Sequence, residues 1–595
     1  MTLQTNLKHS KFKQNITLSL IFLISTITAF LIPLVKFPTE FITRDWGLFD
    51  SFSLFSNSCW NYYKTFPLHN PYVFGGMDNL ANPQSKVCSP LMVHDLFFSG
   101  PIANLLSLVT LGFVGSFGFF HLLRYLKVDR TISIIVAILF IHASWFHLHY
   151  SEGHVIFGSF MLFGYALLFI LRIEETRYKI LYAILCAFYV LDGGIYAFVY
   201  TQLMLVFSII FRVNGITLKK ITQSILSNKL SSFFALFLFI SLSGIKLLPL
   251  LLIQSDRLPI LENLSLDINS VFHSFFNPLA FILLKVNGGK YIGLMGFHEV
   301  GAYIGIFSIV LITIFLVKNN RSSYLPYLYM ILFFFWIGTG WLDPINPWRI
   351  FQKIPLINNA HIQSRAFFIV DFFLFILVGF ALNFFKTKSL KFVIVVSGLL
   401  IVESLIVSSY PYFKVYDHGY DTLSTKEFPK LITNRTIETT YLTPNGKYWG
   451  FDFQHYNRKN TATKSFMDPS SRTFVKSNDD PDYKGEAYVL NGEGNASILK
   501  YTPRELILHY DLKQSSEIQV NTNFLLGWKS SEKLIPAYNK DGLLTFKPTN
   551  KRGDISFKYR PKFYYFTVYL FFFGILSLLI YFLYERRKTS LISDY

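Results

Sequence analysis

The sequence predicts a polytopic α-helical membrane protein with about twelve transmembrane helices and a polar, mostly β domain before the last helix. The composition, a series of apolar segments and the basic clusters between these segments predict this class. Hydrophobic residues make up 52% of the 595 residues and charged residues only 15%, whereas about a quarter of the residues in a soluble protein are charged. This apolar surplus, which includes 65 phenylalanines, needs lipid as its solvent.

Twelve apolar segments are candidates for membrane-spanning helices. They cover residues 16–35, 102–123, 131–145, 155–171, 180–191, 195–211, 230–253, 302–317, 324–341, 366–385, 392–409 and 563–584. The first is too long for the core of a signal peptide, and no small-residue cleavage site follows it, so we expect an uncleaved helix. Segments shorter than about 17 residues need flanking residues in order to cross.

Basic clusters between the segments predict their orientation. The clusters lie near the N-terminus and at 124–130, 172–179, 212–220, 318–321, 386–391 and 586–588. All of them fall on one side when all twelve segments cross, and removing one segment breaks this agreement, so the positive-inside rule places both termini in the cytoplasm. The net charge of +19 is thereby assigned to topology. Since no RNA or DNA motif is present, we expect no nucleic-acid partner.

The opposite side carries the long loops. They cover 36–101, 146–154, 254–301, 342–365 and 410–561. The last has the size of a domain, and its alternating runs at 505–510, 517–521, 543–547 and 555–559 are typical of strands. We expect a transmembrane domain over 1–409, an extracytoplasmic β-sandwich-like domain over 410–561, and a final helix with a cytoplasmic tail over 562–595.

The position of any chemistry follows from this topology. No P-loop, Rossmann fingerprint, zinc-ligand spacing or nucleophile elbow occurs in the sequence. The cytoplasmic loops are also too short to hold an energy-coupling domain. Any reaction is therefore expected at the outer face.

Two of the three cysteines are close enough in the sequence to form a disulfide at that face. Cys59 and Cys88 share the first outer loop, where an oxidising compartment would allow a disulfide. Two unpaired thiols are the interpretation that we favour. Cys186 lies in an apolar segment.

A carboxylate closely follows the first apolar segment. Asp45, in Thr-Arg-Asp-Trp, is either solvated at the membrane interface or a proton acceptor. Gly and Pro residues over 70–76, 82–84 and 89–90 then predict an ordered loop of fixed shape. Such a loop is a connector unless it supports chemistry.

A second polar group follows the third apolar segment and contains His147, His149, Glu152 and His154. This mixture could ligate a divalent metal, although no helical pair of histidines four residues apart with a third ligand is evident. We favour Glu152 and His154 as groups that move a proton or bind hydroxyls. A solvated loop is the alternative.

Further charged residues lie near the outer ends of later segments. Lys246 is within a segment, where a lysine is functional unless it snorkels to the interface, and Arg257 follows it. Glu299 opens the next segment, where the helix dipole favours a carboxylate, and Tyr303 is close by. Arg365 precedes a helix whose dipole it opposes, so a bound anion is its expected partner.

Three acidic residues lie deeper in the predicted bundle. We expect Asp371 and Glu403 to pair within it. Asp192, at a Gly-Gly break, is expected to line a cavity. One face thus gathers carboxylates and cations at the depth of a lipid phosphate.

Short motifs follow one another in order along nearly the whole chain. They are Arg44-Asp45, Asn70-Pro-Tyr-Val-Phe-Gly-Gly76, Leu80-Ala-Asn-Pro-Gln84, Ser89-Pro90, Glu152-Gly-His154, Leu247-Leu-Pro249, Ser255-Asp-Arg257, Gly301-Ala-Tyr-Ile-Gly305, Gln363-Ser-Arg365, Leu526-Gly-Trp-Lys529, Asp541-Gly542 and Phe557-Lys-Tyr-Arg-Pro561. The set resembles the YfhO-like bacterial membrane proteins of the class C (GT-C) glycosyltransferase superfamily. Two positions depart from the expected pattern, since Lys246 replaces Gln and Leu525-Leu526 replaces Tyr-Pro.

The resemblance implies a GT-C-like fold. It also implies transfer of a sugar from a polyprenyl-phosphate sugar to a glycan or lipid-linked acceptor of the cell envelope, at the outer face of the bacterial inner membrane. An acidic residue in the first outer loop is essential in such enzymes, and that role would fall on Asp45. His154, Glu299 and Tyr303 are expected to bind substrate.

The expected chemistry is simple. A polyprenyl phosphate leaves without a general acid, so cations suffice to stabilise its charge, and Lys246, Arg257 and Arg365 are the candidates. Asp45 is the first candidate for the base and Glu152 the second. One base on one face implies inversion at the anomeric carbon. A transporter or flippase of lipid-linked sugars and a non-catalytic envelope scaffold are the alternatives.

Overall fold

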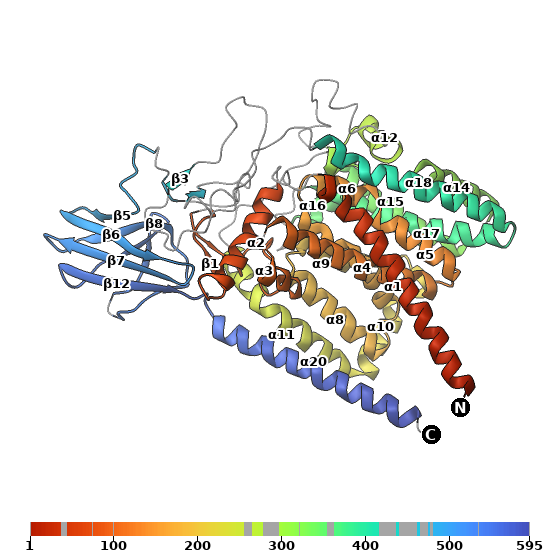
Figure 1. Ribbon diagram of the computed structural model, residues 1–595, viewed down its shortest axis with the longest axis horizontal. Helices are drawn as coiled ribbons and strands as arrows, with labels where there is room; N and C mark the ends of the chain where they lie inside the picture. Colours follow the sequence, from red (N-terminus) through yellow and green to blue (C-terminus); the bar gives the residue numbers. More distant parts are fainter. Residues whose placement is uncertain are drawn as a thin grey trace.

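The computed structural model describes residues 2–36, 45–73, 75–98, 100–254, 265–277, 297–319, 322–353, 362–415, 436–438, 461–463, 474–476, 480–533 and 535–593. A body of helices occupies one part of the molecule and a β region occupies the other (Figure 1). Both marked termini lie at the end of the helical body that is remote from the strands.

The helical body includes long and short helices. The longer α-helices are α1 (Thr2–Lys36), α2 (Asp45–Asn61), α4 (Pro101–Tyr125), α5 (Arg130–Ile141), α8 (Thr176–Leu191), α9 (Ile195–Ile210), α11 (Lys229–Gln254), α14 (Ile306–Lys318), α15 (Leu325–Thr339), α17 (Phe367–Lys386), α18 (Leu390–Val415) and α20 (Tyr564–Ser593). The shorter elements are η1 (Pro90–Met92), α3 (Val93–Phe97), α6 (Ser144–Ser151), η2 (Val155–Leu162), α7 (Phe163–Leu171), η3 (Val213–Gly215), α10 (Leu218–Ser227), α12 (Ile268–Phe276), η4 (Phe297–Glu299), η5 (Ser322–Tyr324), α16 (Pro347–Phe351) and η6 (Gln363–Ala366).

Eight helical stretches in the described part of the chain are long and apolar enough to cross a membrane. They are Lys13–Phe30, Ile102–Tyr125, Arg130–Ser151, Lys229–Leu252, Ser322–Thr339, Gln363–Lys386, Leu390–Pro411 and Tyr564–Arg587. Each coincides with one of the predicted segments. These stretches are consistent with a membrane protein, as the composition predicts.

The other four predicted segments fall on shorter helices, namely η2 with α7, α8, α9 and α14. Helix α9 and the following η3–α10 stretch are bent by 84° at their junction. The start predicted at residue 302 is wrong, because α14 begins only at Ile306. Gly305 has a φ of 100° and Glu403 accepts a hydrogen bond from the Ile306 N–H at 2.8 Å, so the helix is capped there.

The most buried long helix is α17, of whose 20 residues 15 are buried. Phe368 illustrates this packing, since its ring contacts Trp145, Phe160 and Phe163 at centroid distances of 4.7 to 5.0 Å. By contrast α18 and α20 expose many large apolar side chains, as lipid-facing helices do. The aromatic surplus therefore divides between a dense core and an apolar exterior.

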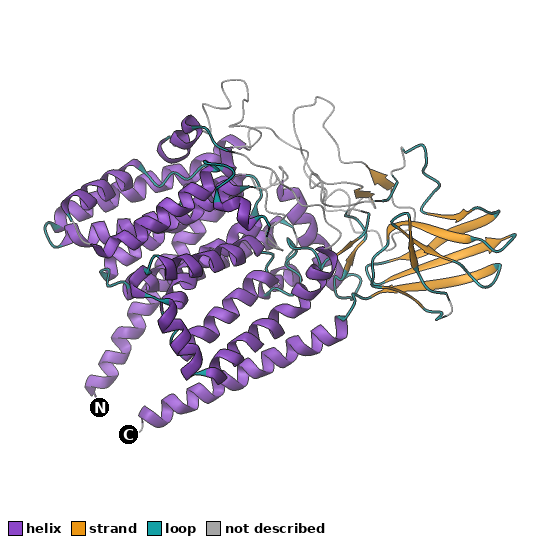
Figure 2. Cartoon of the chain, turned by 180° about the vertical axis from the view of Figure 1, so that it is seen from behind, coloured by secondary structure: helices purple, strands orange, loops and turns teal. Residues whose placement is uncertain are grey.

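The β region contains two antiparallel four-stranded sheets. Figure 2 shows the strands, in orange, to one side of the helices. The first has the order β10 (Tyr538–Lys540), β11 (Leu543–Phe546), β8 (Glu517–Asn523), β5 (Ala487–Leu490). The second has the order β6 (Gly494–Tyr501), β7 (Glu505–Leu512), β12 (Arg552–Tyr559), β9 (Trp528–Ser530). Two further pairs are β1 (His69–Asn70) with β2 (Met77–Asp78) and β3 (Thr436–Glu438) with β4 (Thr461–Thr463).

The two large sheets pack face to face. Phe546 of one sheet contacts Phe557 of the other at a centroid distance of 4.9 Å. In β7 the buried side chains alternate with more exposed ones, as the sequence pattern predicts. The four predicted strands are confirmed as β7, β8, β11 and β12, and this β region precedes the last helix. The predicted domain limits 1–409, 410–561 and 562–595 stay predictions.

All three cysteines are free thiols. Cys59 and Cys186 are buried and Cys88 is half-buried. The favoured interpretation of Cys59 and Cys88 as unpaired is therefore confirmed.

Candidate functional site

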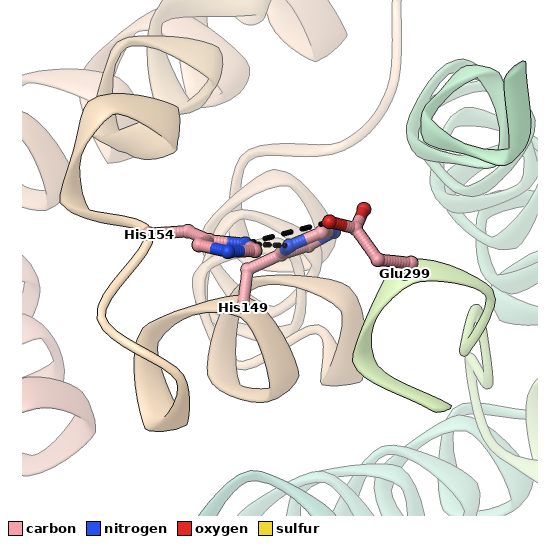
Figure 3. Close-up of side chains that lie close together, drawn as sticks. All are labelled: His149, His154 and Glu299. Carbon is pink, nitrogen blue, oxygen red and sulfur yellow. Dashed lines mark hydrogen bonds and ion pairs between the residues drawn. The ribbon is translucent and has the colours of Figure 1, made fainter. Parts of the chain in front are cut away.

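Of the eight predicted site residues, five form one polar cluster. Asp45 begins α2, Glu152 and His154 follow α6, Glu299 ends η4, and Arg365 lies in η6. His149, on α6, joins them. Figure 3 shows His149, from α6, and His154, from the turn after it, pointing toward Glu299, which comes from a distant part of the chain.

Asp45 and His154 form the outermost pair of this cluster. The His154 Nε2 atom lies 3.0 Å from the Asp45 Oδ2 atom. The Asp45 side chain keeps 27% of its exposure, whereas that of His154 keeps 11%. The carboxylate is thus held by an imidazole on one side and is partly exposed to solvent on the other.

The start of α2 is fixed against the turn that carries Glu152 and His154. The Asp45 N–H donates to the Glu152 carbonyl at 3.1 Å, and the Trp46 indole N–H donates to the Tyr150 carbonyl at 2.7 Å. Gly153 has a φ of 92°, and a Cβ there would lie 2.0 Å from the Trp46 nitrogen. Only glycine allows this approach, so the backbone of Asp45 is positioned by these contacts, while its carboxylate is held by His154.

His154 also bonds to His149. Their Nδ1 atoms are 2.9 Å apart, so one ring donates and the other accepts. With neutral rings, His154 Nε2–H donates to Asp45 and His154 Nδ1 accepts from His149. That tautomer assignment places Asp45, His154 and His149 on one hydrogen-bonded chain that can polarise toward the exposed carboxylate.

Glu299 and Arg365 form a buried ion pair with two hydrogen bonds. The Arg365 Nε and NH2 atoms donate to Glu299 Oε2 and Oε1 at 2.9 and 2.6 Å. The guanidinium also lies over the rings of Phe157 and Tyr196, at 4.9 and 4.7 Å from their centroids. Burial opposes the charge of Glu299, but the charge and hydrogen bonds of Arg365 hold the pKa of the Glu299 carboxyl well below its usual value.

This pair corrects one expectation. A bound anion was the expected partner of Arg365, and the structure supplies Glu299 instead, 66 residues earlier in the chain. A planar guanidinium matches a carboxylate bidentately, which explains why this partner is preferred inside the protein.

Glu152 is nearly fully buried and faces a second histidine. Its Oε1 atom lies 3.9 Å from His298 Nδ1, and His298 Nε2 lies 3.7 Å from Glu299 Oε1. The Glu152 side chain keeps only 1% of its exposure. It is therefore placed to support His298, and it is a poorer candidate than Asp45 for contact with an incoming hydroxyl.

Three side chains of the cluster could together ligate a divalent metal ion. One atom each of His149, His154 and Glu299 lie within 4.8 Å of one another, a spacing that suits a divalent cation. The bidentate contact of Arg365 places a positive charge on the same carboxylate, which opposes a cation there. The hydrogen-bonded arrangement thus favours proton handling, and a metal would need Arg365 to move.

Lys246 does not join the cluster, contrary to expectation. Its ammonium donates to the Ser85 carbonyl and, at 3.1 Å, to the Leu191 carbonyl, and the residue is completely buried. In the described part of the chain no hydrogen bond or ion pair connects Lys246 to Asp45 or Arg365. The position of Lys246 in the sequence indicated its depth, but its side chain faces the segment between α2 and η1, at Ser85, instead of the site.

The remaining predicted residues are also placed differently. The Tyr303 hydroxyl donates to Glu403 Oε1 at 2.6 Å, so both belong to the cap of α14. Asp371 was expected to pair with Glu403, but neither of its oxygens has a hydrogen-bond partner among the described residues. Asp192 accepts from the Ser89 hydroxyl at 2.6 Å. Arg257 lies outside the described residues.

Sequence reasoning missed His298. It directly precedes Glu299 and stands between that residue and Glu152, with its ring 5.1 Å from that of His154. The adjacent His-Glu pair was the available signal, but only the carboxylate was selected from it. Comparisons with protein-family models and with curated proteins find no match for this chain.

Proposed function

We propose that this protein is a membrane glycosyltransferase that moves a sugar from a polyprenyl-phosphate sugar to a glycan or lipid-linked acceptor of the cell envelope. The observation that carries the proposal is Asp45, a partly exposed carboxylate held by His154. It belongs to a helical body that contains eight described helices long and apolar enough to cross a membrane. A carboxylate oriented by an imidazole is suited to accept one proton from a hydroxyl.

In the proposed reaction Asp45 takes the proton of the acceptor hydroxyl. The hydroxyl oxygen attacks the anomeric carbon, and the bond from that carbon to the phosphate oxygen breaks. The electron pair leaves with polyprenyl phosphate. A single displacement of this kind inverts the anomeric carbon.

Charge on the departing phosphate needs cations or donors near Asp45. Lys246 is committed to backbone carbonyls and Arg365 to Glu299, so neither offers a free charge in this arrangement. The candidate donor is the imidazole of His298, whose ring lies 5.1 Å from that of His154, because both nitrogens of His154 are already bonded to Asp45 and His149. Arg365 contributes only if a phosphate displaces the Glu299 carboxylate.

The proposed setting is the bacterial inner membrane, with twelve crossings, cytoplasmic termini and the β region outside. The distribution of basic loops supports this orientation. The position of both termini at the end of the helical body remote from the strands fits it as well (Figure 1).

The rate of sugar transfer by the Asp45→Asn variant tests the proposal. Purified protein in lipid nanodiscs receives a polyprenyl-phosphate sugar and an acceptor mixture, and free polyprenyl phosphate is measured. We expect the variant to lose at least about 100-fold in rate, because an amide cannot take the proton. Asp50→Asn, on the same helix, is the matched control, since Asn104 donates to Asp50 from within the protein at 2.7 Å.

Two results would count against the proposal. One is near-normal release by Asp45→Asn, and the other is no release by the wild-type protein with any donor tested.

Transport of a lipid-linked sugar is the second candidate. Asp371 favours it, since a buried carboxyl within a membrane-length helix is the kind of group that carries protons in transporters. Movement of a labelled lipid-linked sugar across a vesicle membrane, without release of polyprenyl phosphate, would identify that activity.

A further inference from the structure

A second set of contacts lies outside the site and joins the β region to the first outer loop. The loop forms the hairpin β1–β2, in which His69 pairs with Asp78 and Asn70 with Met77. This hairpin lies between α2 and the large sheets (Figure 1).

The tip of the hairpin is held by β8. The Gly75 carbonyl accepts from the Asn523 N–H at 2.9 Å and from the Thr522 hydroxyl at 3.0 Å. Gly76 has a φ of 107°, and a Cβ there would lie 2.7 Å from the Thr522 hydroxyl and 3.0 Å from the His69 ring. The loop and the strand therefore meet at a distance that only glycine permits.

The base of the hairpin is held by β12. The Tyr559 hydroxyl donates to Asp78 Oδ2 at 2.7 Å, while Asp78 Oδ1 accepts from the N–H groups of Leu80 and Ala81. The His69 ring contacts the rings of Trp528 and Tyr559 at centroid distances of 5.0 and 5.2 Å. Each partner is buried, so these bonds are shielded from water.

The apolar packing is continuous across the same boundary. A single core contains Leu48, Phe55 and Cys59 of α2 together with residues of both large sheets. Tyr72 of the loop connects them, with its ring 6.4 Å from that of Phe55. The helix that begins with Asp45 thus shares its core with the β region.

We propose that the β region is a positioning element for α2, with Tyr559 and Asp78 as positioning residues that hold Asp45 against His154. The effect of this role on sugar transfer rests on the proposed function, whereas the placement of α2 does not. The α2 helix is fixed at its start by the Tyr150–Gly153 turn and along its length by the hairpin. Loosening the hairpin frees α2 while the Asp45 side chain and its partners stay unchanged.

Hydrogen exchange of α2 in the full-length protein, in nanodiscs, tests the placement. We expect Tyr559→Phe and Gly76→Ala to speed exchange of α2 amides on the order of tenfold. Matched controls are Tyr538→Phe, which loses a hydroxyl bonded to Glu517 within the sheet, and Gly485→Ala, which has a φ of 103° and open space around its Cβ. Equal exchange in the test and control variants would overturn the proposal.

Kinetics then test the consequence. In a positioning role Tyr559→Phe lowers kcat for transfer with little change in KM for the donor. Asp78→Asn keeps a carbonyl oxygen for the Leu80 and Ala81 N–H groups and an amide N–H that can donate to the Tyr559 hydroxyl oxygen, so it preserves kcat where Asp78→Ala does not. A loss shared equally by Asp78→Asn and Asp78→Ala contradicts the role. If the wild-type protein shows no transfer, the proposed function fails, and the exchange experiment still decides the placement of α2.

Discussion

At the scale of single residues, the Glu299–Arg365 pair has the largest consequence for stability. Both side chains are buried, so each charge depends on the other. We expect Arg365→Leu to lower the free energy of unfolding by about 3–5 kcal/mol, because it leaves an unpaired buried carboxylate. Thermal unfolding in detergent measures this, with Arg349→Leu as the control, because its partner Asp343 is partly exposed.

The double variant separates charge from packing. Glu299→Gln with Arg365→Leu should recover most of the lost stability, since no charge is then left buried. If the double variant is as unstable as Arg365→Leu alone, the loss comes from packing on Phe157 and Tyr196 and not from charge.

Asp371 makes the opposite prediction. Its carboxyl is surrounded by apolar side chains of α17 and has no hydrogen-bond partner among the described residues. An unpaired charge there would be very costly, so a neutral amide of the same shape should be tolerated in its place. Asp371→Asn should therefore keep both the melting temperature and sugar transfer. Loss of lipid-linked sugar transport in this variant, with transfer absent throughout, would favour the transporter.

Asp78 predicts a dependence on pH. Burial raises the pKa of the Asp78 carboxyl from 3.8 to about 6, against the hydrogen bond from Tyr559 and those from the backbone. A raised pKa means that the folded state binds this proton more tightly, so Asp78 costs stability in full above pH 6, and the cost declines as the pH falls and disappears below the unfolded pKa of 3.8. The full cost is on the order of 3 kcal/mol.

Comparing the wild type with Asp78→Asn isolates this effect from other titrating groups. The amide never carries the charge, so the variant should melt at a higher temperature than the wild type at pH 7.5 and at the same temperature near pH 3, below the unfolded pKa of 3.8. A gap that stays constant with pH would mean that Asp78 does not titrate in this range.

At the scale of elements, the approach of α2 to the turn at Gly153 is the tightest contact of the site. Gly153→Ala should cost about 1–3 kcal/mol in backbone strain and displace the start of α2. We expect sugar transfer to fall sharply because Asp45 moves with the helix. Gly215→Ala is the control, since Gly215 also has a positive φ but no atom lies within 4 Å of its Cβ. Equal activity in both variants would contradict this reasoning.

Some elements were predictable because their pattern is local. The alternation in 505–510 fixes both the strand and its buried face, and the structure confirms it as β7. Segments of eighteen or more apolar residues were equally clear. The start of α14 was not, because it depends on Glu403, 97 residues away, accepting from the Ile306 N–H.

The site was predictable in its residue types and depth but not in its pairing. Asp45, His154 and Arg365 could each be selected as polar groups near helix ends. That Arg365 is neutralised by Glu299, and that Lys246 faces Ser85, depends on how helices rotate about their axes, which the periodicity of these uniformly apolar segments does not fix.

At the scale of the whole molecule, the proposed orientation depends on charge. The last turn of α4 carries Arg124 and the loop between α4 and α5 carries Lys127, and both lie on the cytoplasmic side if the positive-inside rule holds. The turn between β5 and β6 carries Asn491 and lies on the outer side if the β region is extracytoplasmic. The two positions therefore have opposite predicted exposures in an intact cell.

Labelling of single cysteines with an impermeant maleimide tests this arrangement. The background is Cys88→Ser, since Cys59 and Cys186 are buried and should not react. We expect Asn491→Cys to label in intact cells and Lys127→Cys to label only after permeabilisation, because both side chains are exposed and the proposed orientation puts them on opposite sides of the membrane. Labelling of Lys127→Cys in intact cells would show that the orientation is opposite to the proposed one. It would also move Asp45 to the cytoplasmic side, where a donor at the outer face could not reach it.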